Sequence, residues 1–234
     1  MLSPLAVKII SNLPEGLVLF IAKRIVERYL KKYANIVVED FEKVDKVEGT
    51  KIFICNHLSN SDGLVLSKIL KEKYDPYFIA GVKLDNDSTT RLGAMLVKKI
   101  EIKPNSPDKD SITKIVKAIK DGNNILIFPE GTRSRTGAMI EGKRGILLFA
   151  RLTKAKIIPI GMSGTDILLP VNTSGDMGAE TWNKSDVVVK FGDPVEFPKK
   201  EEGENKHDYD DRCMYTLMKS IADLLPEKYR GVYK

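Results

Sequence analysis

Cysteine and histidine are both scarce in this chain, which has two of each among its 234 residues. The cysteines, Cys55 and Cys213, lie far apart in the sequence, so we expect free thiols in a reducing compartment rather than a disulfide framework. No cysteines and histidines are grouped at the spacing of a zinc site. Nowhere do apolar residues run for the roughly 18 positions that a membrane-spanning helix requires. These absences argue against disulfide-rich, zinc-binding and membrane-spanning proteins.

The remaining composition is that of a globular protein, with 42% hydrophobic and 30% charged residues. The length suits one sizeable domain. Lysine and arginine outnumber the acidic residues by 38 to 32, and this excess favours anionic partners such as phosphorylated substrates, coenzyme A or acidic lipid surfaces. The basic residues are dispersed and lack interleaved aromatic residues, so we expect no nucleic-acid partner.

Short apolar runs alternate with amphipathic helical patterns along the chain, which predicts an α/β fold with a mixed, largely parallel sheet flanked by helices. The apolar runs predict strands at 36–38, 51–55, 77–80, 99–103, 124–128, 157–162 and 187–191. The helical patterns cover 62–74, 108–120, 146–152 and 208–225. Pro159 interrupts one predicted strand, and because proline cannot donate to a ladder, we expect that strand to be bulged or at an edge.

The first polar cluster follows the predicted strand at 51–55 and contains His57 and Asp62. Both residues lie between a strand end and a helix start, where α/β sheets usually place their ligands. A histidine with a carboxylate across such a turn can act as a base with its orienting partner. A single match of this kind also occurs by chance, and a histidine after a strand is often a structural group.

The second polar cluster follows the predicted strand at 124–128 and includes Glu130, Gly131, Thr132 and Arg133. Arginine suits phosphate because its planar fork forms bidentate, charge-assisted hydrogen bonds. Glycine lets the backbone approach a ligand closely. Taken alone, this loop also fits a turn with solvated charges, but its pairing with the His57 cluster favours a binding site.

Together the two clusters resemble blocks of the glycerolipid acyltransferase family, in particular its bacterial 1-acylglycerol-3-phosphate acyltransferases. Residues 56–62 resemble the block N-H-x-x-x-x-D, and residues 128–135 resemble F-P-E-G-T-R-S. Residues 158–161 resemble a later block that contains proline, and the resemblance covers roughly Asn35 to Met162. Where the family places an arginine after the strand between the two main blocks, this chain has Lys103.

The resemblance implies transfer of a fatty acyl group from acyl-CoA or acyl carrier protein to the sn-2 hydroxyl of 1-acylglycerol-3-phosphate (lysophosphatidic acid), giving phosphatidic acid. In this reaction His57 is the general base and Asp62 orients it, without a protein nucleophile. No metal or other cofactor is expected. The residues implied in binding the acceptor phosphate are Glu130, Gly131, Thr132, Arg133 and Lys103.

Two other functions fit the same residues. In the first, the acceptor is another lysophospholipid or a polar-lipid hydroxyl, and the reaction type is unchanged. Alternatively, the chain is a non-catalytic protein that binds anionic lipids through its basic surface. Turnover of acyl-CoA with release of free thiol separates catalysis from binding.

The sequence divides into an N-terminal amphipathic segment, residues 1–33, and an acyltransferase domain, residues 34–234. In the N-terminal segment, apolar residues at helical spacing from Leu17 to Tyr29 oppose basic residues such as Lys23 and Arg24. A basic amphipathic helix can lie in a membrane interface, and the same pattern fits a helix packed on the domain core. Because the implied substrates are lipids, we expect a membrane-interface anchor and a peripheral or monotopic protein on the cytoplasmic side of the cell membrane.

Overall fold

The computed structural model describes residues 13–81, 95–102, 109–172 and 180–234. Its α-helices are α2 (Glu15–Tyr33), α3 (Glu42–Asp45), α4 (Asp62–Leu70), α6 (Lys109–Lys120), α7 (Gly145–Thr153), α8 (Thr165–Leu168) and α9 (Lys206–Ala222). Its strands are β1 (Ala34–Glu39), β2 (Lys51–Cys55), β3 (Tyr77–Gly81), β4 (Lys99–Ile102), β5 (Ile125–Ile127), β6 (Lys156–Ser163) and β7 (Ser185–Phe191). Two short 3-10 helices, η3 (Glu227–Tyr229) and η4 (Gly231–Tyr233), follow α9.

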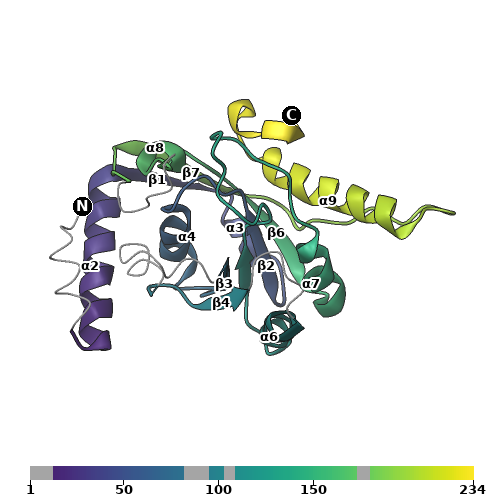
Figure 1. The fold of residues 1–234 in the computed structure, drawn as a ribbon, viewed down its shortest axis with the longest axis horizontal. Helices are drawn as coiled ribbons and strands as arrows, with labels where there is room; N and C mark the ends of the chain where they lie inside the picture. The colour runs from purple at the N-terminus through teal and green to yellow at the C-terminus, as the bar shows by residue number, and fades with distance from the viewer. Residues whose placement is uncertain (1–12, 82–94, 103–108, 173–179) are drawn as a thin grey trace.

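The strands form one seven-stranded sheet in the order β1-β7-β6-β2-β5-β3-β4. Neighbouring strands are parallel, except that β6 and β7 are antiparallel. Helices α6, α7 and α9 lie on one side of the sheet, and α2 and α4 lie on the other (Figure 1). The prediction of a mixed, largely parallel sheet flanked by helices is confirmed.

Strand β2 lies at the centre of the sheet, and all five of its residues are buried. Its side chains alternate between the two faces, as the pleat of a strand requires. Ile52 and Ile54 belong to a core cluster shared with α6, α7 and α9, whereas Phe53 and Cys55 belong to a second cluster shared with α4. Because both faces are covered, β2 after Lys51 is a continuous apolar run, Ile52 to Cys55, rather than an alternating one.

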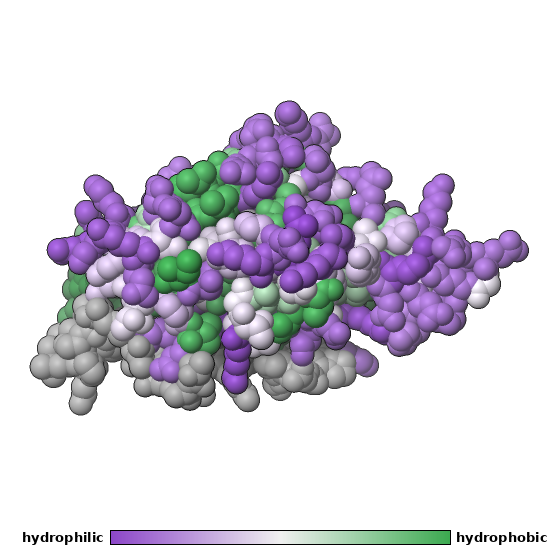
Figure 2. All heavy atoms as spheres, turned by 90° about the horizontal axis from the view of Figure 1, so that it is seen from above, coloured by the Kyte–Doolittle hydropathy of each residue, from purple (hydrophilic) through white to green (hydrophobic). Residues whose placement is uncertain are grey.

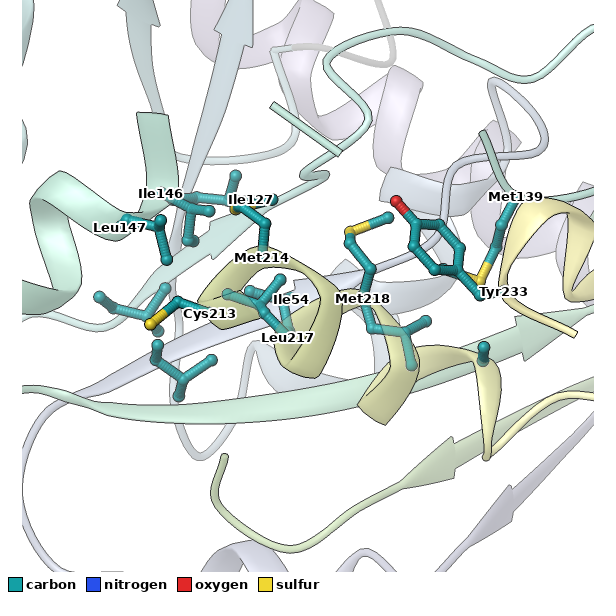
Figure 3. Packing of buried hydrophobic residues seen from close by; sticks show 14 of the residues in the cluster. Ile54, Ile127, Met139, Ile146, Leu147, Cys213, Met214, Leu217, Met218 and Tyr233 are labelled. Carbon is teal, nitrogen blue, oxygen red and sulfur yellow. The ribbon is translucent and has the colours of Figure 1, made fainter. Parts of the chain in front are cut away.

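Helix α9 covers the first of these clusters with the apolar residues of one face. Met214, Leu217 and Met218 pack beside Ile54 and Ile127 of the central strands (Figure 3). The N-terminal end of α9 is highly charged. Figure 2 shows hydrophilic side chains at the end of the molecule where α9 begins. The helix thus combines a helically spaced apolar face with a solvated start.

The expectation that the strand containing Pro159 is bulged or at an edge is wrong. Strand β6 is central, between β7 and β2, and seven of its eight residues are buried. The carbonyl of Pro159 accepts a hydrogen bond from the amide of Gly192 at 2.9 Å, just beyond the last ladder pair, Ile160 with Phe191. The nitrogen of Pro159 therefore faces the β7 side of β6, at a point where the ladder between the two strands has already ended. The missing N–H group breaks no ladder hydrogen bond there.

Several helix boundaries also differ from the prediction, among them the end of the last helix, which is Ala222 instead of Leu225. The helix that begins at Asp62 ends at Leu70 instead of Tyr74, because the amides of both Tyr74 and Asp75 bond to the Leu70 carbonyl in a turn before Pro76. The last helix begins two residues earlier than expected, since the Asn205 side chain caps it by accepting the Asp208 amide at 3.0 Å.

Helix α2 is only partly packed on the domain. Its buried residues are Val18, Ala22 and Leu30, whereas Leu17 and Phe20 are 45% and 57% exposed. Residues 1–12 of the N-terminal segment lie outside the described residues. Among the described helices, none combines the length and the apolar character needed to cross a membrane. The membrane-interface anchor remains a prediction.

Candidate active site

The first loop, residues 56–62, joins the end of β2 to the start of α4 and brings His57 and Asp62 into contact. His57 Nδ1 lies 2.8 Å from Asp62 Oδ2. The same oxygen accepts the backbone amides of Leu58 at 2.7 Å and Ser59 at 2.9 Å, so the fully buried carboxylate is held in place by the turn itself. If Nδ1 carries the proton donated to Asp62, Nε2 is left as a proton acceptor. The geometry is that of a base with an orienting carboxylate.

Helix α4 begins without the usual side-chain cap. Ser61 occupies the N-cap position but has no capping side-chain hydrogen bond, and its hydroxyl lies 2.9 Å from that of Ser59. Asp62, the first helical residue, instead accepts the backbone amides of Leu58 and Ser59 in the preceding loop. Its other oxygen, Oδ1, is buried without a hydrogen-bond partner among the described residues. Among the described side chains, the imidazole of His57 is the one that hydrogen-bonds to this buried carboxylate.

The ring of His57 is fixed from a second direction by Phe128, the residue that follows β5. The two rings stack with centroids 4.0 Å apart and an interplanar angle of 15°. The imidazole side chain stays 20% exposed, so a substrate can reach it. Phe128 thus limits rotation of the imidazole. The stacked ring also restricts the side from which a substrate can approach the imidazole.

Asn56 holds the start of the first loop against the neighbouring strand. Its side-chain amide donates to the Met162 carbonyl and accepts the Met162 amide, both at 2.8 Å. This reciprocal pair continues the β2–β6 ladder by one step with a side chain instead of backbone. The backbone at His57 is therefore anchored where the strand ends.

The second loop, residues 128–135, follows β5 and lies beside the first loop, because β2 and β5 are adjacent parallel strands. The Ser134 amide donates to the His57 carbonyl at 2.7 Å. Glu130 is fully buried, and its two oxygens accept the backbone amides of His57 at 2.8 Å and Ile140 at 2.9 Å. In this structure Glu130 braces the backbone of the first loop, and a direct contact with substrate remains a prediction.

The environment of Glu130 also changes its ionisation. Burial raises the pKa of Glu130 from 4.5 to about 7, against the two backbone amides that lower it, and the nearby charge of Asp62 adds to the rise. A carboxyl group that holds the His57 backbone therefore titrates near neutral pH.

Arg133 is turned toward the interior of the site, where its Nη1 lies 2.7 Å from Oε1 of Glu180. Glu180 is buried, and its Oε2 accepts the side-chain amide of Asn60 at 2.7 Å. One carboxylate thus connects both loops, since Asn60 belongs to the first and Arg133 to the second. A contact between Arg133 and an acceptor phosphate remains a prediction.

The other predicted binding residues are placed less deeply. Gly131 and Thr132 are exposed, and Lys103 lies outside the described residues. Gly131 has φ +70°, and a Cβ there would lie 3.2 Å from Cε of Lys143, so glycine permits both the turn and the close passage of this lysine. Lysine thus approaches the second loop from a segment that the sequence did not single out.

Cys55, the last residue of β2, directly precedes the first loop. Burial raises the pKa of the Cys55 thiol well above its usual value, with the charges of Asp62 and Glu130 adding to the effect, so this cysteine is a poor nucleophile. Among the described residues, no three histidine, cysteine or acidic side chains are grouped so that they could hold a metal ion.

The sequence did not identify three residues that shape the site: Asn56 as a ladder extension, Phe128 as the stacking partner of His57, and Glu180 as the partner of Arg133. Asn56 and Phe128 lie inside the two sequence blocks at 56–62 and 128–135, so the sequence pattern could have pointed to them. Glu180 lies in an irregular segment far along the chain, and no local pattern points to it.

A family model described as acyltransferase matches residues 35–163, more than half of the chain. The chloroplastic 1-acyl-sn-glycerol-3-phosphate acyltransferase LPAT1 of Arabidopsis thaliana is 25% identical over 158 residues, which cover 67% of this chain and 44% of that protein. The 1-acyl-sn-glycerol-3-phosphate acyltransferase of Bacillus subtilis is 30% identical over 107 residues, 44% of this chain and 47% of that protein. The chain spans about half the length of the curated relatives that it matches.

The fold is also found in a solved structure. The 1-acyl-sn-glycerophosphate acyltransferase PlsC of Thermotoga maritima superposes with a TM-score of 0.57 at 22% identity, covering 90% of this chain and 85% of that one. At this identity the likeness concerns the fold. It includes regions of the chain outside the family match at 35–163.

Proposed function

The chain belongs to the acyltransferase family, and we propose that it transfers a fatty acyl group from an acyl thioester to the sn-2 hydroxyl of 1-acylglycerol-3-phosphate, giving phosphatidic acid. The observation that carries the proposal is the 2.8 Å contact between His57 and Asp62 at the carboxyl end of β2. Relatives named as 1-acyl-sn-glycerol-3-phosphate acyltransferases support the choice of acceptor.

In the proposed reaction, His57 Nε2 removes the proton from the acceptor hydroxyl as its oxygen attacks the thioester carbonyl. The tetrahedral intermediate collapses, the carbon–sulfur bond breaks, and the departing thiolate receives the proton from the imidazolium. Asp62 holds the productive tautomer and stabilises the imidazolium while it exists. Because the attacking oxygen belongs to the acceptor, the reaction needs no protein nucleophile.

Arg133 supplies positive charge for the acceptor phosphate. Its side chain is 18% exposed and belongs to the loop whose Ser134 amide bonds to the His57 carbonyl, so a group bound there lies near the base. A guanidinium group suits a phosphate through charge-assisted, bidentate hydrogen bonds. Thr132, Gly131 and the predicted Lys103 complete the proposed acceptor site.

The donor in this proposal is acyl-CoA or acyl carrier protein, and the reaction uses no metal or other cofactor. Deprotonation by a positioned histidine and expulsion of a thiolate together supply the required chemistry. Thiolate is a far better leaving group than the alkoxide of the product, so transfer proceeds toward the ester.

We further propose that α2 places the protein on the cytoplasmic face of the cell membrane, as a peripheral or monotopic protein. Leu17 and Phe20 are exposed on this helix, with Lys23 and Arg24 in the following turn. Insertion of apolar side chains and attraction of basic ones to anionic headgroups act together at an interface. The buried residues of the same helix attach it to the domain that holds the site.

An acceptor screen with a single acyl-CoA tests the proposed reaction. Release of free CoA thiol is measured with lysophosphatidic acid, with other lysophospholipids and without acceptor. We expect the highest kcat/KM with lysophosphatidic acid. Preference for another acceptor would reassign the substrate, and lipid binding without thiol release would identify a non-catalytic lipid-binding protein.

Vesicle co-sedimentation tests the role of α2. The double substitution Leu17→Ser and Phe20→Ser should reduce binding to anionic vesicles while leaving the fold intact, since both side chains are exposed. The matched control replaces Leu148 and Leu152, exposed leucines of α7, with serine. If both double variants bind vesicles as well as the wild type, α2 is not the anchor.

A further inference from the structure

Glu180 is a buried carboxylate that lies outside the residues matched by the family model, 35–163. It precedes β7 in the chain, yet its side chain enters the candidate active site. Oε1 accepts from Arg133 Nη1, and Oε2 accepts from the Asn60 side chain, both at 2.7 Å. The backbone amide of Asn172 also approaches Oε1, at 3.4 Å. Both carboxylate oxygens therefore have donors, as a buried charge requires.

The contact with Arg133 uses one nitrogen of the guanidinium group. Among the described residues, Glu180 is the only hydrogen-bond acceptor for this side chain, which keeps 18% of its area exposed. A guanidinium group has five N–H donors in a fixed planar fork, so a contact through Nη1 alone leaves other donors available. An anion can bind these donors without displacing the carboxylate.

The backbone that carries Glu180 is itself anchored. Two residues further on, Trp182 packs edge-on against Tyr29 of α2, with ring centroids 5.5 Å apart. The next residue, Asn183, donates its amide to the Leu168 carbonyl of α8 at 2.9 Å. The carboxylate is therefore attached to fixed backbone and can impose its position on a long, flexible arginine side chain.

We propose that Glu180 is the positioning residue for Arg133. It holds one nitrogen of the guanidinium so that the remaining donors are directed to the acceptor phosphate, and it keeps Asn60 of the first loop at a fixed separation from the second. The proposal rests on the proposed function, because it assigns Glu180 a role in binding the phosphorylated acceptor. Glu180 does not touch the reacting atoms.

Positioning through Arg133 makes a specific kinetic prediction. A loosened arginine binds phosphate less well but leaves the base and the thioester untouched, so the effect should concern the KM of the acceptor. Loss of a charge-assisted hydrogen bond corresponds to about a tenfold change or more. The conservative variant Glu180→Gln retains an oxygen that accepts from Arg133, and it should recover most of the affinity.

The test measures CoA release by the full chain with lysophosphatidic acid and acyl-CoA, varying each substrate in turn. Glu180→Ala should raise the acceptor KM by about tenfold and leave kcat and the donor KM within about twofold. Glu180→Gln should stay within about threefold of the wild type in all three quantities. Glu202→Ala, at an exposed glutamate, is the matched control and should change nothing.

A double-mutant cycle separates positioning from a merely structural role. In the Arg133→Ala background, Glu180→Ala should change the acceptor KM by less than about twofold, because its effect acts through the missing arginine. Should Glu180→Ala not fold, Glu180→Asp replaces it: the shorter side chain keeps the charge but cannot reach both Arg133 and Asn60, so the acceptor KM should again rise.

Three results would overturn the positioning role: equal increases in both KM values, the same increase in the Arg133→Ala background, or a folded Glu180→Gln as impaired as Glu180→Ala. These results differ from failure of the proposed reaction. A wild-type protein that releases no thiol with lysophosphatidic acid refutes the reaction, whereas normal wild-type turnover with an unchanged acceptor KM in Glu180→Ala refutes the positioning role alone.

Discussion

The two loops at the carboxyl ends of β2 and β5 are built in different ways. In the first loop, the important pair is local: His57 and Asp62 are five residues apart and contact each other directly. In the second loop, Glu130 and Arg133 are close in sequence but turn to different partners. Glu130 reaches the backbone of His57, and Arg133 reaches Glu180, 47 residues away.

This difference separates two kinds of contribution to the site. The first loop brings its base and carboxylate into contact through its own turn, and Glu130 and Ser134 of the second loop then hold the backbone of His57. The second loop depends on distant partners, because Glu130 is satisfied by backbone amides and Arg133 by a buried carboxylate. Substitutions in the first loop should therefore affect the chemical step, and those in the second should affect binding and stability.

The largest expected effect is that of His57→Ala. Removing the proposed general base should lower kcat by roughly three orders of magnitude, within the range known for positioned acid–base groups. The control is His207→Ala, which removes the other histidine of the chain, an exposed residue on α9, and should leave kcat unchanged. Near-wild-type turnover by a folded His57→Ala variant would exclude the proposed mechanism.

Arg133→Ala should have a smaller effect, of a different kind. We expect the acceptor KM to rise about ten- to a hundredfold, as for lost charge-assisted hydrogen bonds, with a smaller change for the donor. The substitution also leaves Glu180 buried without its ion-pair partner, which lowers the melting temperature.

Adding Glu180→Gln to Arg133→Ala separates these two consequences. The second substitution should restore much of the thermal stability, because it removes the uncompensated charge, and it should leave the acceptor KM high. Arg151→Ala, which breaks an exposed ion pair with Asp210, is the control and should change neither quantity appreciably. A double variant that melts no higher than Arg133→Ala would contradict the role of Glu180 as a buried charge.

The smallest expected effect is the influence of Glu130 on the pH dependence of stability. Its pKa is raised from 4.5 to about 7 in the folded protein, so folding favours its protonated form. The resulting stabilisation is complete below pH 4.5 and is lost as the pH rises through 7, a change of at most about 3 kcal/mol.

Glu130→Gln removes this titration. Compared with the wild type, the variant should become relatively more stable as the pH is raised from 4.5 to 8, whatever constant cost the lost amide contact imposes. Urea unfolding at several pH values gives the difference in unfolding free energy. A difference that does not vary with pH would show that Glu130 does not titrate in this range.

The sequence predicted the parts of the fold and of the site that depend on near neighbours in the chain. The mostly apolar run at 51–55 identified β2 because a strand covered on both faces has few polar positions, and the first loop was recognisable from residues that contact one another. The prediction for Pro159 was wrong because it depends on a distant strand. The nitrogen of Pro159 faces the β7 side of β6, and whether a ladder hydrogen bond is lost there depends on where β7 ends.

Glu180 was not predictable for a related reason. Its role depends on the sheet order, which brings the segment before β7 to both loops, and nothing in its local sequence distinguishes it from a surface glutamate. The inward turn of Glu130 has the same origin, because the backbone amides that it binds belong to His57 and Ile140. Long-range partners of this kind become visible only in the folded protein.

The central claim is that Asp62 orients His57 for proton transfer, and Asp62→Asn tests it most directly. An asparagine can occupy the same space, but its amide favours the wrong imidazole tautomer and cannot stabilise an imidazolium. We predict that kcat for acyl transfer to lysophosphatidic acid falls by roughly three orders of magnitude, while both KM values stay within about twofold of the wild type. A folded Asp62→Asn variant that keeps its kcat and changes only a KM would contradict the claim.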